Sequence, residues 1–190
     1  MIRVISGTYK GKKLKRVPSS LVRPMPDKLK QSLFNILHDE IKGAHFLDGF
    51  AGTGSVGIEA LSRGAGTVVF IDEYYPAIKV LRENLARCGA EDQARVIHRE
   101  FNRAIIRLSK EGVGFDLIFL DPPYKLLEDR DPLKVLAKRA VLNPGGKIIL
   151  RHYRKIKPRN KFFRLKRSVT LGDDTLSFYI LNASCQNRPS

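Results

Sequence analysis

The chain has 190 residues, with 35 lysines and arginines against 19 aspartates and glutamates, which gives a formal net charge of +16. This length suits one well-buried domain, and no apolar stretch is long enough to span a membrane or to form a signal peptide, so we expect a cytoplasmic protein. The two cysteines, Cys88 and Cys185, follow no pairing pattern, and the four histidines form no ligand-like cluster. Neither a disulfide framework nor a metal site is therefore expected.

The first 43 residues predict an extension that packs on the main sheet. Apolar and basic residues alternate around two glycines, which is typical of a short β-hairpin. Prolines then mark a loop, and Asp27 can cap a following amphipathic helix. We expect the hairpin and helix over residues 1–43, a main domain over 44–182 and a disordered tail over 183–190.

From residue 44 onward, apolar runs typical of buried strands alternate with segments typical of helices. Strands are expected near residues 45–48, 67–71, 94–98 and 115–120, and helices near 55–63, 75–87, 101–110 and 131–140. A further strand after Gly146 and a C-terminal hairpin complete the series. This rhythm predicts an α/β fold with a mainly parallel sheet and helices on both faces.

The turn after the first strand of the main domain is rich in glycine. Asp48 ends that strand, and Gly52 opens the pattern Gly-x-Gly-x-x-Gly, which lets the backbone turn tightly and approach a ligand. Asp72 ends the next strand, about 20 residues further on, where a dinucleotide site has its ribose-binding acid. A dinucleotide site is therefore one interpretation. Asp48 argues against it, because a carboxylate there repels a pyrophosphate, whereas S-adenosylmethionine has no phosphate and carries an ammonium and a sulfonium.

The third strand ends near Glu100 and Phe101. In a doubly wound sheet the adenine of the cofactor lies at this strand end, with Phe101 beside the ring and Glu100 near its polar edge. An ordinary place in the core of a helix is the alternative interpretation of Phe101.

The sequence Asp121-Pro122-Pro123-Tyr124 follows the fourth strand directly, at the end where open α/β sheets place their ligands. It suits an amino group on a flat base, which is a poor nucleophile because its lone pair is delocalised into the ring. Asp121 and the Pro122 carbonyl can accept from the N–H groups, the prolines stiffen the turn, and Tyr124 can stack on the base. A surface turn is the alternative interpretation.

Basic residues gather toward both ends of the chain, and acids lie mainly between them. The first cluster includes Arg3, Lys10, Lys12 and Arg23, and the second includes Arg154 and Lys155. Two basic ends around a central site fit a polyanion. We therefore expect a nucleic acid as partner, with phosphate contacts that supply affinity and a pocket that supplies specificity.

Together these motifs resemble the RsmD family of bacterial 16S ribosomal RNA guanine-N2 methyltransferases, within the class I S-adenosylmethionine-dependent methyltransferases. The resemblance covers nearly the whole chain and is carried by residues 3–14, 23–24, 33–37, 47–54, 57–65 and 121–124. It implies a Rossmann-like, seven-stranded sheet, S-adenosylmethionine as cofactor, and methylation of the N2 amine of a guanine in 16S ribosomal RNA. The substrate is expected in the 30S subunit or an assembly intermediate.

The resemblance also implies roles for single residues. Catalytic roles fall to Asp121, Pro122, Pro123 and Tyr124, and cofactor contacts to Asp48, Phe50, Ala51, Gly52, Gly54, Asp72, Glu100 and Phe101. RNA contacts are expected from Arg3, Lys10, Lys12, Arg23, Arg154 and Lys155. The chain departs from the family pattern at Met25, where threonine is usual, at Lys30 and Gln31, where an Arg-Glu pair is common, and at Arg151, near the place of a usual glutamate.

Other functions stay open at this point. An adenine-N6 or cytosine-N4 DNA methyltransferase shares the Asp-Pro-Pro-Tyr chemistry, but such enzymes generally need a separate recognition domain, for which this chain has little room. A non-catalytic RNA-binding or assembly module with a degenerate cofactor fold is a second alternative. A nicotinamide oxidoreductase ranks last because of Asp48.

Overall fold

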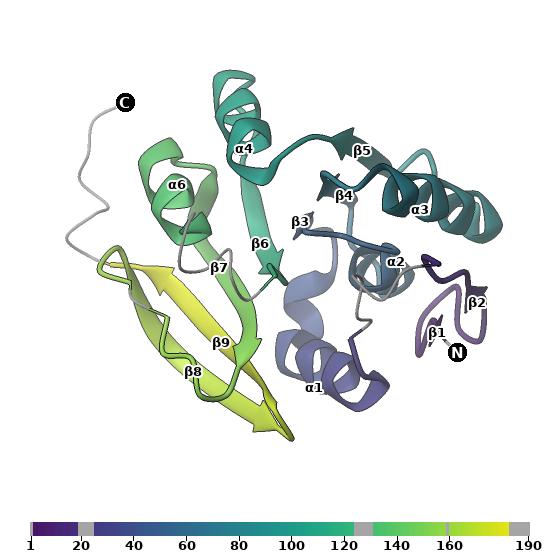
Figure 1. Cartoon of the computed structure of the whole chain (residues 1–190), viewed down its shortest axis with the longest axis horizontal. Helices are drawn as coiled ribbons and strands as arrows, with labels where there is room; N and C mark the ends of the chain where they lie inside the picture. The colour runs from purple at the N-terminus through teal and green to yellow at the C-terminus, as the bar shows by residue number, and fades with distance from the viewer. Residues whose placement is uncertain (1, 19–24, 124–130, 159, 183–190) are drawn as a thin grey trace. The chain divides into compact units, whose positions relative to one another are not determined.

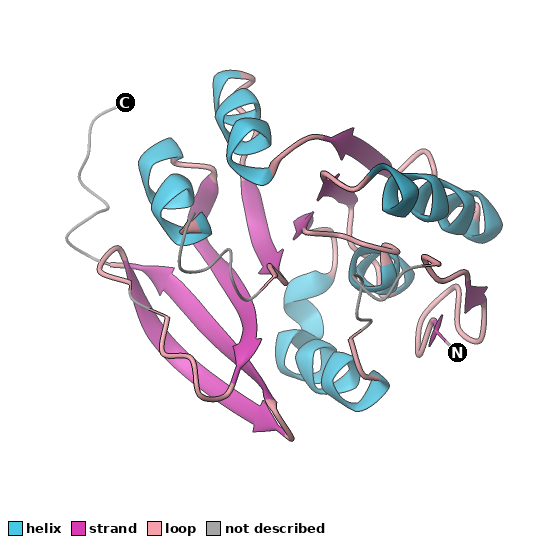
Figure 2. Ribbon diagram, viewed as in Figure 1, coloured by secondary structure: helices cyan, strands magenta, loops and turns pink. Residues whose placement is uncertain are grey.

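The computed structural model describes residues 2–18, 25–123, 131–158 and 160–182 (Figure 1). Helices and strands alternate along most of the chain (Figure 2). The residues form two compact units, Met1–Phe101 and Asn102–Ser190, which we call the N-terminal and C-terminal units. No helix of the described ranges is long and apolar enough to cross a membrane.

Three parallel strands form the sheet of the N-terminal unit. They are β3 (His45–Gly49), β4 (Thr67–Asp72) and β5 (Ala94–His98), in the order β5-β4-β3. Helix α2 (Ser55–Ser62) connects β3 to β4, and α3 (Tyr75–Cys88) connects β4 to β5. Because the strands are parallel, their carboxyl ends lie at one edge of this sheet.

The N-terminal extension contains a short hairpin and a helix. Strands β1 (Ile2–Arg3) and β2 (Lys13–Leu14) pair antiparallel, and α1 (Asp27–Leu37) leads into the 3-10 helix η1 (His38–Ile41). Asp27 does not cap α1 as expected: Pro26 holds the cap position, and Asp27 lies in the first turn. An acid there still stabilises the helix, because it lies near the positive end of the helix dipole.

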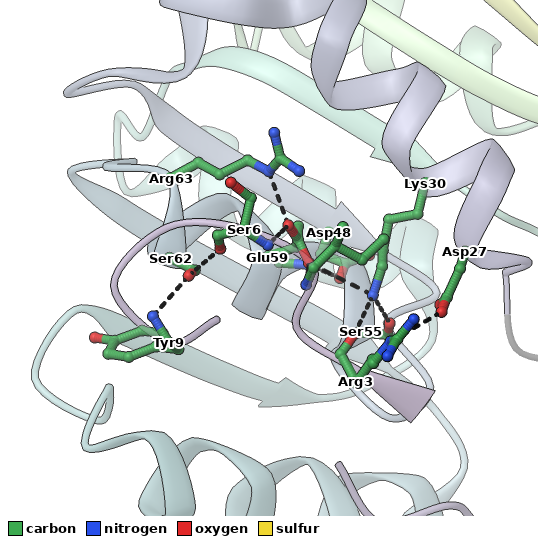
Figure 3. Close-up of polar contacts among 12 residues, drawn as sticks. Arg3, Ser6, Tyr9, Asp27, Lys30, Asp48, Ser55, Glu59, Ser62 and Arg63 are labelled. Carbon is green, nitrogen blue, oxygen red and sulfur yellow. Dashed lines mark hydrogen bonds and ion pairs between the residues drawn. The ribbon is translucent and has the colours of Figure 1, made fainter. Parts of the chain in front are cut away.

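The extension is tied to α2 by a buried polar network (Figure 3). The Glu59 carboxylate accepts hydrogen bonds from the backbone N–H groups of Ile5 (2.7 Å) and Ser6 (3.0 Å) and from Arg63 Nε (2.8 Å). Lys30 Nζ lies 3.6 Å from Glu59 Oε2, and neither side chain has exposed surface. One acid of α2 therefore satisfies donors of the extension and of its own helix.

The C-terminal unit has a mixed sheet. Its strands are β6 (Phe115–Leu120), β7 (Leu142–Tyr153), β8 (Phe163–Leu171) and β9 (Asp174–Leu181), in the order β6-β7-β9-β8. The β6–β7 pairing is parallel, and β9 pairs antiparallel with both β7 and β8. Helices α4 (Phe101–Lys110) and α6 (Pro132–Arg139) precede β6 and β7.

These elements confirm the predicted α/β fold class, with seven mainly parallel strands besides an N-terminal hairpin and helix. Two boundaries differ from the expectation. Strand β7 begins at Leu142, before the glycine pair, and β8 runs on to Leu171 through a mostly exposed, charged stretch. Such a stretch lacks the clear apolar alternation by which a strand is recognised in sequence.

Candidate functional site

The glycine-rich turn after β3 is tightly folded. Phe50, Gly52 and Gly54 have φ angles of 69°, 54° and 78°, in the left-handed region. A Cβ atom on Gly54 would lie 2.2 Å from Leu81 Cδ1, so both the backbone angle and the packing require glycine there. The Ala51 N–H donates to the Ile71 carbonyl at 2.9 Å, which fixes the turn against β4.

Asp48, at the end of β3, is buried with 1% of its surface exposed. Its Oδ2 accepts a hydrogen bond from the Gly57 N–H at 2.8 Å, in the first turn of α2. The N–H groups of a first helical turn lack partners within the helix, so this acid stabilises the start of α2. Contact between Asp48 and a cofactor stays a prediction.

Asp72, at the end of β4, bridges two backbone segments. Its Oδ2 accepts from the Gly52 N–H at 2.7 Å, and its Oδ1 accepts from the Tyr74 N–H at 2.8 Å. Burial raises the pKa of Asp72 above its ordinary value, and hydrogen bonds from the backbone N–H groups of Tyr74, Gly52 and Glu73 oppose that shift. The structure therefore brings together Gly52 and Asp72, two residues that were predicted for one site. The carboxylate has about four lone-pair sites, so it can accept from a further donor, such as a ribose hydroxyl.

Two aromatic rings from separate strand ends meet in the N-terminal unit. Phe50 and Phe101 are stacked, with ring centroids 4.8 Å apart and planes inclined by 23°. Phe101 is 3% exposed, whereas Phe50 and Glu100 are partly exposed. Both rings were predicted to contact the cofactor, but their contact with each other was not predicted. Their positions, each just beyond the end of a parallel strand, could have suggested it.

The Asp-Pro-Pro segment belongs to the C-terminal unit. Asp121 directly follows β6, and its side chain is 25% exposed. Its Oδ2 accepts a hydrogen bond from Arg151 Nη1 at 2.7 Å. Burial raises the pKa of Asp121, and the charge and hydrogen bond of Arg151 oppose that shift. Tyr124 lies outside the described residues.

The residues predicted to contact RNA have different environments. Lys10 and Lys155 are exposed. Arg3 Nε lies 3.5 Å from Asp27, and Arg154 Nε lies 3.3 Å from Asp173, both in exposed pairs. Lys12 donates from Nζ to the carbonyls of Arg87 and Cys88, at the end of α3. Arg23 lies outside the described residues.

A cavity of about 580 Å³ lies in the N-terminal unit, away from these motifs. It is lined by Ser6, Gly7, Thr8, Phe34, Asn35, His38, Asp39, Ile41, Lys42, Ser62, Arg63 and Gly64. No predicted site residue lines it. It adjoins the C-terminal end of α2, whereas the glycine-rich turn leads into the N-terminal end, about 12 Å along an eight-residue helix.

Residues 2–180 match the model of the family described as Conserved hypothetical protein 95. The Bacillus subtilis protein named "Putative rRNA methyltransferase YlbH" is 39% identical over 82% of this chain and 84% of its own. The Haemophilus influenzae protein named "Ribosomal RNA small subunit methyltransferase D" is 36% identical over 77% of this chain and 76% of its own. The chain belongs to the RsmD family of methyltransferases.

A solved methyltransferase structure has a fold similar to this one. The structure described as "Putative methyltransferase yhhF from Escherichia coli" superposes with a TM-score of 0.81 and 30% identity, over 96% of this chain and 98% of that one. The resemblance inferred from the motifs is thereby confirmed. No cluster of three or more potential metal ligands occurs in the part of the RsmD-family chain that the structure describes.

Proposed function

We propose that this chain methylates the exocyclic N2 amine of a guanine in 16S ribosomal RNA. The coarser activity, S-adenosylmethionine-dependent methylation of ribosomal RNA, is that of the family to which the chain belongs. Support for an amino-group target comes from Asp121, a carboxylate held in place at the end of β6 next to two prolines. That carboxylate is the observation that carries the proposal.

The residues of the N-terminal unit suit S-adenosylmethionine, which supplies a methyl group on a positively charged sulfur. Asp72 is already held by the backbone of the glycine-rich turn, and its remaining lone pairs can accept from ribose hydroxyls. The exposed part of Phe50 offers an aromatic surface, backed by Phe101, for a purine. Asp48 and Asp72 both make this strand edge acidic, which disfavours a pyrophosphate and thus a dinucleotide.

In the C-terminal unit, Asp121 and the Pro122 carbonyl orient the amine through its N–H groups. The nitrogen gains positive character as its new bond to carbon forms. A nearby carboxylate therefore stabilises the transition state more than the ground state, which is the condition for a rate increase. The stiff Pro122-Pro123 backbone keeps the two acceptors at a fixed spacing.

The RNA substrate is proposed to be 16S ribosomal RNA within the 30S subunit or one of its assembly intermediates, and the activity is proposed to be cytoplasmic. The exposed Lys10 and Lys155 can meet phosphates, which give affinity without sequence choice. A guanine amine in a helix is stacked and paired. The target is therefore a loop guanine or one that is flipped into the site.

The test is a transfer assay with radiolabelled S-adenosylmethionine. Wild-type protein and Asp121→Ala are incubated separately with unmodified 16S RNA, with 30S subunits that lack the modification, and with duplex DNA, and the labelled nucleoside is identified. We expect N2-methylguanosine from a ribosomal substrate, and loss of turnover but not of cofactor binding in Asp121→Ala. Methylated adenine or cytosine from DNA, or tight cofactor binding without any transfer, contradicts the proposal.

A further inference from the structure

Arg151 is a nearly buried cation beside the proposed catalytic acid. It lies in β7 and is 3% exposed. Leu120 pairs with Leu150 in the parallel β6–β7 ladder, so the next residues along, Asp121 and Arg151, are neighbours. On its other side, β7 pairs with β9, the strand that begins at Asp174. In that pairing Arg151 lies opposite Leu176, and its long side chain reaches Asp174, which pairs with Tyr153 two residues along β7. Arg151 therefore lies between two acids.

The guanidinium contacts the two acids through different sides. Nη1 donates to Asp121 Oδ2 at 2.7 Å, while Nε and Nη2 lie 3.1 and 3.0 Å from Asp174 Oδ1. A guanidinium is planar and its donors form a rigid fork, so contacts on two sides fix its plane. Arg151 thus links Asp174 of β9 to Asp121 and restrains the position of the Asp121 carboxylate.

The exposures of the three side chains differ in an informative way. Arg151 and Asp174 are 3% and 10% exposed, but Asp121 is 25% exposed. In the described part of the chain, Arg151 is the hydrogen-bond partner of Asp121 and contacts only its Oδ2. Among the residues that the structure describes, no hydrogen bond reaches the second oxygen, Oδ1. The partial exposure of Asp121 leaves its carboxylate accessible to a substrate, which a fully enclosed ion pair would not be.

Asp174 also supports the charge of the arginine. Burial disfavours a charged guanidinium, yet the two carboxylates outweigh it and raise the pKa of Arg151 above its ordinary value. The neighbouring His152 does not join this group, because its Nε2 lies 2.9 Å from Ser177 Oγ and its Nδ1 lies 3.0 Å from the Tyr153 carbonyl. Within the described ranges, the charged groups that act on Asp121 are Arg151 on β7 and Asp174 on β9.

We propose that Arg151 is a positioning residue for methyl transfer: it holds Asp121 by Oδ2, with Asp174 as its anchor, and leaves Oδ1 to accept from the target amine. This inference rests on the proposed function of Asp121. Arg151 gives the Asp121 carboxylate both a hydrogen-bond donor and a counter-charge.

The first experiment compares Arg151→Gln, Arg151→Lys and a control, Arg107→Gln, in the transfer assay. Arg107 is an exposed arginine of α4 that pairs with Glu111. We expect Arg151→Gln to lower kcat by about 10–100-fold, the range typical of residues that orient a functional group, with the Kd for S-adenosylmethionine changed less than about threefold. Arg151→Lys keeps the charge but loses the fork, so its kcat should lie between those of Arg151→Gln and wild type. Arg107→Gln should match wild type.

A second measurement needs no substrate. The carboxyl carbon of Asp121 is followed by NMR against pH in protein with labelled aspartate, for wild type and Arg151→Lys, and for Arg151→Gln if it folds. Loss of the arginine should move the titration of Asp121 to higher pH. A wild-type kcat in folded Arg151→Gln, or an unchanged Asp121 titration in both variants, overturns the inference. If wild type methylates none of the substrates, the proposed function fails, while the titration still decides whether Arg151 controls Asp121.

Discussion

Lys30 and Glu59 form an ion pair in which neither side chain reaches solvent, and this pair joins α1 to α2 (Figure 3). Lys30 also donates to the Arg3 carbonyl at 2.8 Å and to Ser55 Oγ at 3.0 Å. Burial lowers the pKa of Lys30 because the enclosed ammonium loses hydration, and the attraction of Glu59 opposes that shift. Replacement of either residue should therefore lower the free energy of unfolding, but by different amounts.

Replacement of Glu59 should destabilise the protein more than replacement of Lys30. Glu59→Ala leaves the N–H groups of Ile5 and Ser6 without their acceptor and the buried Lys30 ammonium without its counter-charge, and breaking a buried pair in this way costs about 3–5 kcal/mol. Lys30→Met leaves Glu59 with three donors and fills the space of the lysine stem, so a loss of about 1–2 kcal/mol is expected. Urea unfolding measures both, with exposed Glu83→Ala as control. Equal losses would contradict this account.

Gly54→Ala should disrupt the glycine-rich turn. The alanine meets Leu81 and must adopt a left-handed backbone, which alone costs about 1–2 kcal/mol. We expect a lower free energy of unfolding and weaker binding of S-adenosylmethionine, measured by urea unfolding and calorimetry. The double variant Gly54→Ala/Leu81→Ala tests the cause, because it restores space without relieving the backbone. Gly89→Ala is a matched control, since Gly89 is also left-handed but has open space around it.

The pH dependence of stability should reveal the burial of Asp121. Its folded-state pKa is raised, so the folded protein binds this proton more tightly than the unfolded chain does. The resulting stability is present below the unfolded pKa and is lost as pH rises through the folded pKa. Asp121→Asn cannot titrate. The free energy of unfolding of the variant minus that of wild type should therefore become more positive as pH rises through this window, and a flat difference would refute the raised pKa.

Variants of Lys12 and Lys10 should have different effects, the first on stability and the second on RNA binding. Lys12→Met removes a cation from the carbonyls that end α3, so we expect a loss of about 0.5–1 kcal/mol in the free energy of unfolding. Lys10→Met removes an exposed charge and should leave stability unchanged while weakening RNA binding. Thermal unfolding and filter binding on both variants provide the comparison. Weaker RNA binding in Lys12→Met alone would reverse the assignment.

The sequence predicted the elements of the fold well because each leaves a local signal. Buried runs such as Phe115–Leu120 and the stripe of α1 follow directly from the period of a strand or a helix. The order of motifs likewise placed Asp48, Asp72 and Asp121 at strand ends, where the structure has them.

Contacts that depend on register or tertiary packing left no such signal. Arg151 meets Asp121 only because β6 and β7 pair as they do, and in the sequence it is one of many cations. Lysine and glutamate are almost never fully buried, so nothing in the sequence marks Lys30 and Glu59 as a buried pair. The family resemblance singled out Lys30 as a departure, but a substitution alone does not identify the residue with which Lys30 pairs.

Cations that form contacts within the fold are less available to bind RNA phosphates. Lys30 is enclosed, Arg151 lies between two acids, Arg63 is bound to Glu59, and Lys12 is engaged at the end of a helix. Binding to a polyanion releases counterions in proportion to the phosphates that are neutralised, and the slope of log K against log salt counts them. That slope should therefore correspond to fewer contacts than a net charge of +16 suggests. Some basic residues of this protein thus stabilise its fold, and RNA binding depends on the others.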